Sequence, residues 1–300
     1  MPLQPRIIPV LLLHKGGLYK TKQFKKPSYV GDPINAVRIF NEKQVDELMI
    51  LDIDCSVNNS APNYELIEEI ASEAFMPVAY GGGVNSLEIA KKLFGLGIEK
   101  VVLNTILQHN TTLIQQIGDI YGAQAVVACI DFKKNLFGKT NAYFKSGSTK
   151  ADQSIPQLAK LYDAAGAGEL LLNDIDREGT YSGYNQLLLK EIVNTVQIPV
   201  VISGGASQNS DFTAAASCGA SGNCFCITRI ILFNSSIKCT LLCNRPAVSI
   251  ITTSASCFTA DCNVSKATEA GSLLISCLII GTSTRSAQTC SWSIAAALNV

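Results

Sequence analysis

Acidic side chains follow several apolar runs of this sequence, at the points where buried strands would end. Asp131 comes directly after the apolar run 126–130. A carboxyl group that leaves an apolar strand is partly desolvated, so its pKa moves up toward the range that suits acid–base catalysis. Asp131 is therefore the candidate catalytic residue. The alternative is a structural ion pair with Lys133 or Lys134.

Glycines end two other apolar runs, and their backbone N–H groups could bind an anion. The segments Gly81–Gly83 and Ser203–Gly205 each follow an apolar run and precede a helical pattern. Glycine-rich turns that lead into a helix form phosphate sites. Two such sites on opposite sides of one opening would suit a substrate with a phosphate at each end. The alternative is that these glycines only permit tight turns.

A basic segment follows the first apolar run of the chain. It begins at His14 and carries Lys15, Lys20 and Lys22 around a Gly-Gly pair. A long Gly/Lys loop beside a substrate opening predicts a mobile lid that attracts phosphate, with Lys20 as a candidate contact. A solvated basic loop is the alternative.

A regular alternation of strands and helices positions these residues. Near-continuous apolar runs are typical of parallel strands that are covered on both faces. Seven are expected, at 6–13, 47–53, 77–80, 100–103, 125–130, 169–172 and 199–202. Helical patterns lie between them, such as 63–74, 86–96, 157–165 and 185–195. The alternation predicts a parallel α/β fold.

An internal repeat narrows the choice of fold. Residues 46–54 match 168–176, and residues 76–83 match 198–205, both at an offset of 122. Two halves of four βα units each predict a (β/α)₈ TIM barrel with half-barrel symmetry. A Rossmann fold is the weaker alternative, because no GxGxxG follows the first strand.

The composition changes abruptly after residue 222. Residues 223–300 hold seven of the 48 charged residues, eight of the 11 cysteines and 21 Ser or Thr. The repeat fails at the same point, where an eighth strand should begin. We therefore expect a barrel of seven strands in residues 1–222, with the eighth βα unit missing or replaced by an anomalous tail at 223–300. Such an open barrel would expose strand edges that aggregate.

Three explanations of the tail compete. A metal-binding appendage would use Cys224, Cys226, Cys239 and Cys243, whose spacings are irregular for zinc. A disulfide module conflicts with the reducing compartment that the cysteine-poor residues 1–222 indicate. We favour a shift of reading frame near codon 222, because loss of Gly and charge with gain of Ser, Thr and Cys suits out-of-frame translation.

Composition also limits the location and the partners. Lys and Arg number 24, as do Asp and Glu, so the net charge is zero and a nucleic-acid partner is not expected. No apolar run reaches the roughly 18–20 residues of a membrane span, and the N-terminus lacks a signal-peptide pattern. We expect a cytoplasmic protein with no membrane contact, no metal and no cofactor.

Over residues 4–222 the sequence resembles the HisF family, the cyclase subunit of imidazole glycerol phosphate synthase. The motifs that carry the resemblance are Arg6-Ile7-Ile8-Pro9, Leu51-Asp52-Ile53, Gly81-Gly82-Gly83, Asn104-Thr105, Ala128-Cys129-Ile130-Asp131, Gly166-Ala167-Gly168-Glu169, Asp176-Arg177-Glu178-Gly179-Thr180 and Ser203-Gly204-Gly205-Ala206. The resemblance implies a lyase/cyclase of histidine biosynthesis. A HisH-like glutaminase docks at the N-terminal barrel face, and its ammonia crosses the barrel to attack a bis-phosphorylated aminoimidazole ribonucleotide.

The resemblance also assigns roles to individual residues. It implies that a charged ring at the barrel floor gates the ammonia, and the ring residues here are Arg6, Glu47, Lys100 and Glu169. It further implies that Gly83, Asn104 and Thr105 form one phosphate site, and that Gly179 and Gly205 form part of the other.

One position departs from the family pattern. The family uses two aspartates, one at the end of the first strand and one at the end of the fifth. The second is Asp131, but Leu12 stands in the place of the first. The pattern is similar to a HisF-like paralogue that is associated with glycan amidation and passes ammonia to a separate amidating enzyme. We favour this type, and the histidine-pathway cyclase is the alternative.

Overall fold

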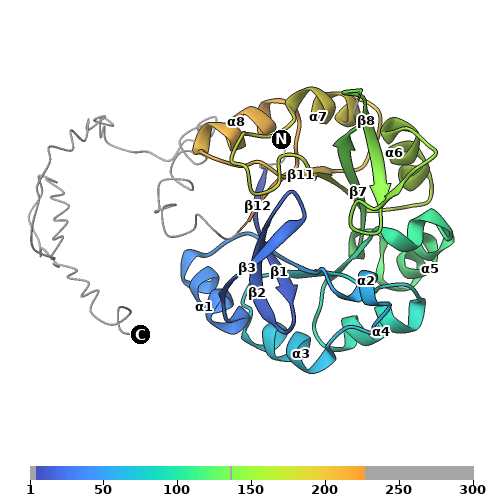
Figure 1. The fold of residues 1–300 in the computed structure, drawn as a ribbon. Helices are drawn as coiled ribbons and strands as arrows, with labels where there is room; N and C mark the ends of the chain where they lie inside the picture. The colour runs from blue at the N-terminus through green and yellow to red at the C-terminus, as the bar shows by residue number, and fades with distance from the viewer. Residues whose placement is uncertain (1–4, 136, 227–300) are drawn as a thin grey trace, which may run out of the picture. The chain divides into compact units, whose positions relative to one another are not determined.

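Eight parallel strands close into a barrel, as the alternation of the sequence predicts (Figure 1). The structure is a computed structural model that describes residues 5–135 and 137–226, all within one compact unit. In order around the barrel the strands are β1 (Arg6–His14), β4 (Leu48–Asp52), β5 (Val78–Gly81), β6 (Lys100–Leu103), β7 (Val126–Lys134), β10 (Glu169–Asp174), β11 (Val200–Ser203) and β12 (Gly222–Cys226). The TIM-barrel prediction is confirmed.

Strand β12 corrects the expectation of an open barrel. It pairs in parallel with β1, from Arg6↔Gly222 to Val10↔Cys226, and with β11 on its other side. The predicted absence of an eighth strand is therefore wrong, and the barrel extends past the boundary expected at residue 222. The repeat missed this strand because hydrogen bonds to two neighbours determine it, more than its own residue types. A closed ring also removes the edges from which we predicted aggregation.

The helices form a layer around the barrel (Figure 1). They are α1 (Pro33–Lys43), α3 (Tyr64–Glu73), α4 (Leu87–Gly95), α5 (Thr112–Tyr121), α6 (Ile155–Ala164), α7 (Gln186–Val193) and α8 (Asn209–Ser217). Shorter turns are α2 (Cys55–Asn58), η1 (Thr105–Gln108) and η2 (Ala123–Ala125). Side chains of Asp32, Asn63 and Ser86 accept backbone N–H groups at the starts of α1, α3 and α4, which explains where these helices begin. None of the described helices is both long and apolar enough to cross a membrane.

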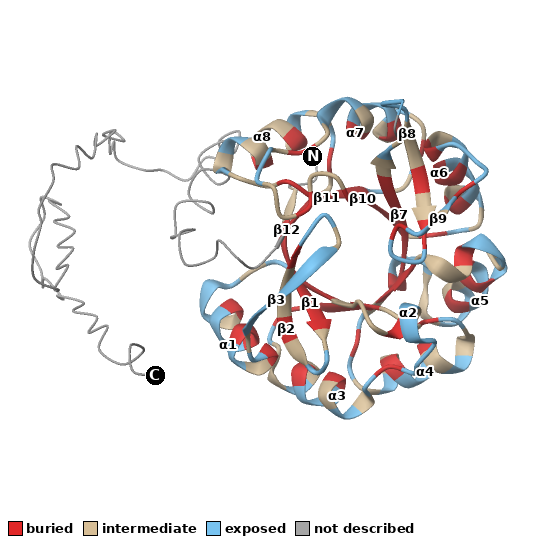
Figure 2. Cartoon of the chain, viewed as in Figure 1, coloured by how far each residue is buried: buried red, intermediate tan, exposed pale blue. Residues whose placement is uncertain are grey.

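Alternation along the strands produces two apolar layers. Figure 2 shows that the barrel strands are largely buried. Residues that point outward pack under the helices, whereas residues that point inward fill the barrel. The inward layer consists of Ile8, Val10, Leu12, Met49, Ala79, Val102, Val127, Cys129, Leu171, Val201 and Cys224. Cys224 is thus part of the buried barrel wall, which removes it as a ligand of a metal-binding tail. The remaining tail hypotheses concern residues 227–300, which lie outside the described residues.

Two β-hairpins rise from the C-terminal ends of the barrel strands. The first consists of β2 (Gly17–Lys22) and β3 (Lys25–Gly31), and β2 pairs with β1. The second consists of β8 (Thr140–Phe144) and β9 (Thr149–Lys150), and β8 pairs with β7. The basic segment that we expected to be a loop is therefore an ordered hairpin. The sequence analysis did not predict the second hairpin.

Candidate functional site at the carboxyl ends of the strands

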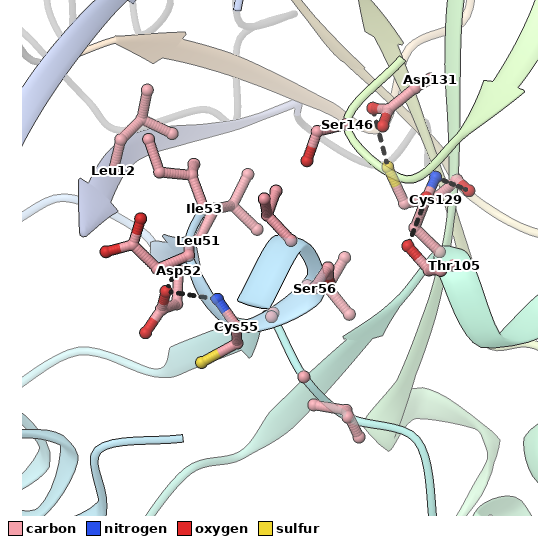
Figure 3. A pocket seen from close by; sticks show the side chains of 18 of the residues that line it. Leu12, Leu51, Asp52, Ile53, Cys55, Ser56, Thr105, Cys129, Asp131 and Ser146 are labelled. Atoms are coloured by element: carbon pink, nitrogen blue, oxygen red, sulfur yellow. Dashed lines mark hydrogen bonds between the residues drawn. The ribbon is translucent and has the colours of Figure 1, made fainter. Parts of the chain in front are cut away.

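A cavity of about 440 Å³ opens at the C-terminal ends of the barrel strands (Figure 3). Many of the residues singled out from sequence line it, among them Leu12, His14, Gly81–Gly83, Asn104, Thr105, Asp131 and Ser203. They come from five different strands or the turns that follow them. The barrel therefore brings together residues that are up to 191 positions apart in the sequence.

Asp131 is buried at the wall of this cavity and is held by two neighbours. Its Oδ1 accepts hydrogen bonds from Asn173 Nδ2 at 2.9 Å and from the Cys129 thiol at 3.7 Å. Burial raises the pKa of Asp131 to about 6, and these two hydrogen bonds oppose the increase. A carboxyl group with this pKa can both accept and donate a proton near neutral pH.

The structural alternative for Asp131 is not formed. Lys133 Nζ donates instead to the Gly147 carbonyl at 2.7 Å and lies 4.3 Å from the centre of the Tyr143 ring. The backbone N–H of Lys134 donates to Asp176 Oδ2 at 2.7 Å. The carboxyl group of Asp131 therefore faces the cavity without a cationic partner among the described residues.

Equivalent hydrogen bonds in the two half-barrels identify the counterpart of Asp131 on β1. The N–H of Lys15 donates to Asp54 Oδ2 at 2.7 Å, as the N–H of Lys134 does to Asp176. Likewise, Ile53 N–H donates to Leu13 O (3.1 Å) and Ile175 N–H donates to Phe132 O (2.9 Å). In both pairs of bonds the residues after β4 and β10 differ by 122 positions, whereas the residues at the ends of β1 and β7 differ by 119. Applied to Asp131, this offset leads to Leu12. The internal symmetry thus shows an apolar side chain where the other half-barrel has its carboxyl group.

A histidine–aspartate pair stands two residues beyond Leu12. His14 Nδ1 lies 2.6 Å from Asp54 Oδ1, and the edge-to-face ring of Tyr19 lies 4.7 Å away between centroids. This contact fixes the orientation of the His14 ring through its Nδ1 atom. Both residues line the cavity. We call the open end of the barrel, at the C-terminal ends of the strands, the mouth. The His14–Asp54 pair can transfer a proton on the β1 side of the mouth.

The glycine turns after β5 and β11 are equivalent in detail. A Cβ on Gly82 would lie 2.4 Å from the Asp52 carbonyl oxygen, and one on Gly204 would lie 2.5 Å from that of Asp174. Both glycines have positive φ angles, of 121° and 92°. The turns therefore need glycine for close backbone approach. Gly81–Gly83 all line the cavity, whereas only Ser203 does so from the segment Ser203–Gly205.

Three predicted phosphate-site residues do not line the cavity. Gly179 packs under the first hairpin, where a Cβ would lie 2.3 Å from the Thr21 carbonyl oxygen. A Cβ on Gly205 would lie 2.3 Å from the Gly183 carbonyl oxygen. Lys20 is half-buried in β2. Among the described residues, the cavity thus includes the residues of one predicted phosphate site and only Ser203 of the other. Phosphate binding at both sites stays a prediction.

The first hairpin covers part of the mouth. At its turn, the N–H of Gln23 donates to the Glu178 carbonyl at 2.9 Å, and its Nε2 donates to the Asp176 carbonyl at 2.8 Å. Thr21, Phe24 and Pro27 contribute to the cavity wall. The hairpin therefore stands in the place that we predicted for a lid.

Four charged side chains converge at the opposite end of the barrel. Arg6 donates to both Glu47 and Glu169. Lys100 Nζ lies 2.7 Å from Glu47 Oε2 and 3.3 Å from Glu169 Oε2, which completes a ring. The carboxylates are 2% and 4% exposed, and burial lowers the pKa of Lys100. Two cations and two anions balance each other here, so no charge is buried alone.

The sequence analysis did not predict the roles of three residues that hold the titratable groups of the cavity. Asn173 orients Asp131, Cys129 donates to it, and Asp54 orients His14. Alternation along β10 would have placed Asn173 on the inward face with Glu169. Nothing in the sequence indicates that Asp54, 40 positions away, meets His14.

Comparison with known proteins agrees with this geometry. The family described as "Histidine biosynthesis protein" matches residues 6–236. A Pseudomonas aeruginosa protein, provisionally named imidazole glycerol phosphate synthase subunit hisF2, is 48% identical over 206 residues, or 69% of this chain and 82% of its own. The chain belongs to the HisF family.

Other members of the HisF family are similar over the same share of the chain. A provisionally named HisF subunit of Leptospira borgpetersenii is 44% identical over 68% of this chain and 81% of its own length. Imidazole glycerol phosphate synthase subunit HisF of Chloroherpeton thalassium is 36% identical over 68% of this chain and 81% of its own length. The family resemblance on residues 4–222 is thus confirmed.

Proposed function

We propose that this HisF-family chain receives ammonia from a HisH-like glutaminase at the floor ring and passes it through the barrel for glycan amidation. The observation that carries the proposal is Leu12, which occupies the symmetry counterpart of Asp131. Leucine cannot donate or accept a proton, so the cyclisation reaction of the family loses one of its two carboxyl groups. Removal of such a group costs roughly 10²–10⁴-fold in rate.

The barrel interior supports transport of a neutral nitrogen compound. Between the floor ring and the cavity the inward side chains are apolar or thiol-bearing. An ammonium ion would lose its hydration here at high cost, whereas ammonia crosses at a much smaller one. The ring of Arg6, Glu47, Lys100 and Glu169 closes the floor, so we infer that entry of ammonia requires Lys100 or Arg6 to move.

One assay tests the proposal. The chain is supplied with ammonia and the aminoimidazole ribonucleotide, and imidazole glycerol phosphate is measured, while glutamine hydrolysis is followed with the glutaminase partner. We expect stimulation of glutamine hydrolysis without formation of that product. Lys100→Met should uncouple ammonia transfer from hydrolysis, with Lys91→Met on the outer surface of α4 as the control. Product formation at the rate of a histidine-pathway enzyme would contradict the proposal.

The His14–Asp54 pair favours a second candidate, the cyclase of histidine biosynthesis. If His14 Nε2 supplies the proton transfer that Leu12 cannot, the chain forms imidazole glycerol phosphate, and His14→Gln abolishes it. Lys190→Gln, at an exposed position of α7 away from the cavity lining, is the control. Product formation that is insensitive to His14→Gln would exclude this role of the pair.

A further inference from the structure

The two hairpins at the mouth concentrate positive charge in a chain that has no net charge. Residues 15–31 and 133–150 contain ten of the 24 Lys and Arg residues and none of the 24 Asp and Glu residues. The rest of the chain is correspondingly acidic. A dipolar charge distribution of this kind orients an approaching partner toward one end of the molecule.

The two hairpins approach each other at their turns. A Cβ on Gly147, in the turn between β8 and β9, would lie 3.9 Å from the Phe24 ring at the tip of the first hairpin. Exposed lysines lie on the first hairpin (Lys22, Lys25 and Lys26), beside the turn between β8 and β9 (Lys145 and Lys150) and at the turn between β7 and β8 (Lys134 and Lys139). Figure 2 shows β3 as a largely exposed strand above the barrel. We call these lysines the rim lysines.

The rim lysines do not serve the cavity. The cavity wall takes Thr21, Phe24 and Pro27 from the first hairpin and Ser146 from the second, but none of the rim lysines. A small anion in the cavity would therefore be bound by the glycine turn after β5, not by these side chains. Their charge faces outward, where a macromolecular partner could contact it.

Exposed apolar side chains accompany the charge. Tyr29 and Val30 on β3 are 62% and 40% exposed, and Phe137 before β8 is 93% exposed. Aromatic anchors among basic side chains are common at the centre of protein interfaces. Isolated exposed hydrophobic residues need no explanation, but here they lie beside rim lysines, on β3 and at the turn between β7 and β8.

We propose that the rim lysines, with Tyr29 and Phe137, dock an acidic face of the enzyme that consumes the ammonia. This inference rests on the proposed function, because ammonia that leaves an open mouth is protonated in neutral water and no longer attacks an acceptor. A partner that covers the mouth keeps the nitrogen neutral until it reacts. An anionic membrane has the same charge, but it would close the mouth without providing an acceptor.

Charge reversal on the hairpin tests the proposal. The complex of the full chain with its glutaminase is titrated with the purified amidating enzyme of the same glycan system, at about 50 and about 300 mM salt. The variant is Lys22→Glu/Lys25→Glu/Lys26→Glu. The matched control is Lys91→Glu/Lys160→Glu/Lys190→Glu, which makes the same charge change on exposed lysines of α4, α6 and α7. Glutamine hydrolysis and circular dichroism verify that both variants are folded.

The proposal expects the hairpin variant to bind at least about tenfold more weakly at low salt, while the control binds like the wild type. Equal binding by wild type and hairpin variant contradicts the docking site but leaves the proposed function intact. No binding of the amidating enzyme to the wild type contradicts both. Titrations with inorganic pyrophosphate and with phosphatidylglycerol vesicles complete the test. If the hairpin variant binds pyrophosphate or the vesicles more weakly than the wild type does, but binds the amidating enzyme equally well, the proposal is overturned.

Discussion

At the scale of single residues, the two half-barrels have equivalent backbone positions at the mouth but different side chains at them. Asp131 and Leu12 occupy equivalent positions of the two half-barrels, and only one of them titrates. The chemistry of the mouth therefore depends on which other groups can exchange a proton with a ligand. His14, oriented by Asp54 at 2.6 Å, is the group on the β1 side.

The buried carboxyl group of Asp131 predicts a pH-dependent stability. Its pKa is about 6 in the folded chain and about 3.9 in the unfolded chain. The folded state binds the proton more tightly, so the free energy of unfolding decreases as pH rises from about 4 to about 6, by roughly 1–3 kcal/mol. Asp174, whose pKa burial also raises to about 6, contributes a decrease of the same sign over the same range. Asp131→Asn should therefore make the decrease smaller than in the wild type without abolishing it, as measured by urea unfolding at both ends of the range.

The exposed Asp152 supplies the control for this prediction. Asp152→Asn should retain the pH dependence of the wild type. If Asp131→Asn shows the same decrease as the wild type, then Asp131 is not the group that titrates.

Leu12→Asp should restore a carboxyl group opposite Asp131. If the proposed function holds, the wild type has little ammonia-dependent formation of imidazole glycerol phosphate, and the variant gains at least roughly 10²-fold. Leu12→Asn is the control, because asparagine has the same size as aspartate and is polar, but it cannot transfer the proton. A gain that is equal in both variants would show that polarity, not proton transfer, limits the reaction.

At the scale of elements, tight βα turns position the site. In the turn after β5, Gly82 lets the backbone approach Asp52 closely enough that Gly83 and its neighbours line the cavity. The equivalent turn after β11 uses Gly204 in the same way. These turns allow no side chain, because both the positive φ and the nearby carbonyl oxygen exclude one.

Substitution of this glycine should be costly. Gly82→Ala places a Cβ against the Asp52 carbonyl oxygen, and we expect a loss of roughly 2–4 kcal/mol in the free energy of unfolding. Gly95→Ala is the matched control, since Gly95 lies in α4 with nothing within 4 Å of a Cβ. It should stabilise the chain by about 0.5–1 kcal/mol. Denaturant titration separates the two, and equal effects would contradict the turn argument.

At the scale of the whole molecule, barrel closure by β12 decides whether a cavity exists at all. The closing strand carries one misfit, because Asn223 is fully buried and neither polar atom of its side chain has a hydrogen-bond partner among the described residues. It lies opposite Ile7, a residue of the layer under the helices. A polar side chain there reduces the stability of the strand that closes the ring.

Asn223→Val should therefore stabilise the chain. Removal of an unsatisfied buried amide is worth about 1–3 kcal/mol in the free energy of unfolding. Asn194→Val, at an exposed position after α7, should change it by less than about 0.5 kcal/mol. A lower midpoint for Asn223→Val in thermal unfolding would show that the amide has a partner.

The reading-frame hypothesis also belongs to this scale. Asn223 is the first residue after the change in composition, and asparagine is disfavoured in a strand that is paired on both sides. We predict that translation of the gene after codon 222 in one of the other two frames yields an Ala/Gly-rich eighth strand and an amphipathic helix. If neither frame does so, the tail is encoded as it stands.

The sequence by itself was enough to predict most elements of the barrel and to single out several candidate residues of the site. Seven strands, four of the helices and the two glycine turns follow from apolar periodicity and turn chemistry, because these are local properties. The repeat at an offset of 122 also predicted the equivalence of Asp52 with Asp174. Asp131 could be singled out because it ends an apolar run.

Only the tertiary structure decided which of these residues meet. Closure by β12, the contact of His14 with Asp54 and that of Asn173 with Asp131 depend on strand order and register, which no local pattern encodes. The four floor charges likewise converge only because eight tilted strands bring their N-terminal ends to one axis. Residues far apart in the chain become a site through closure of the ring, and closure is a property of all the strands together.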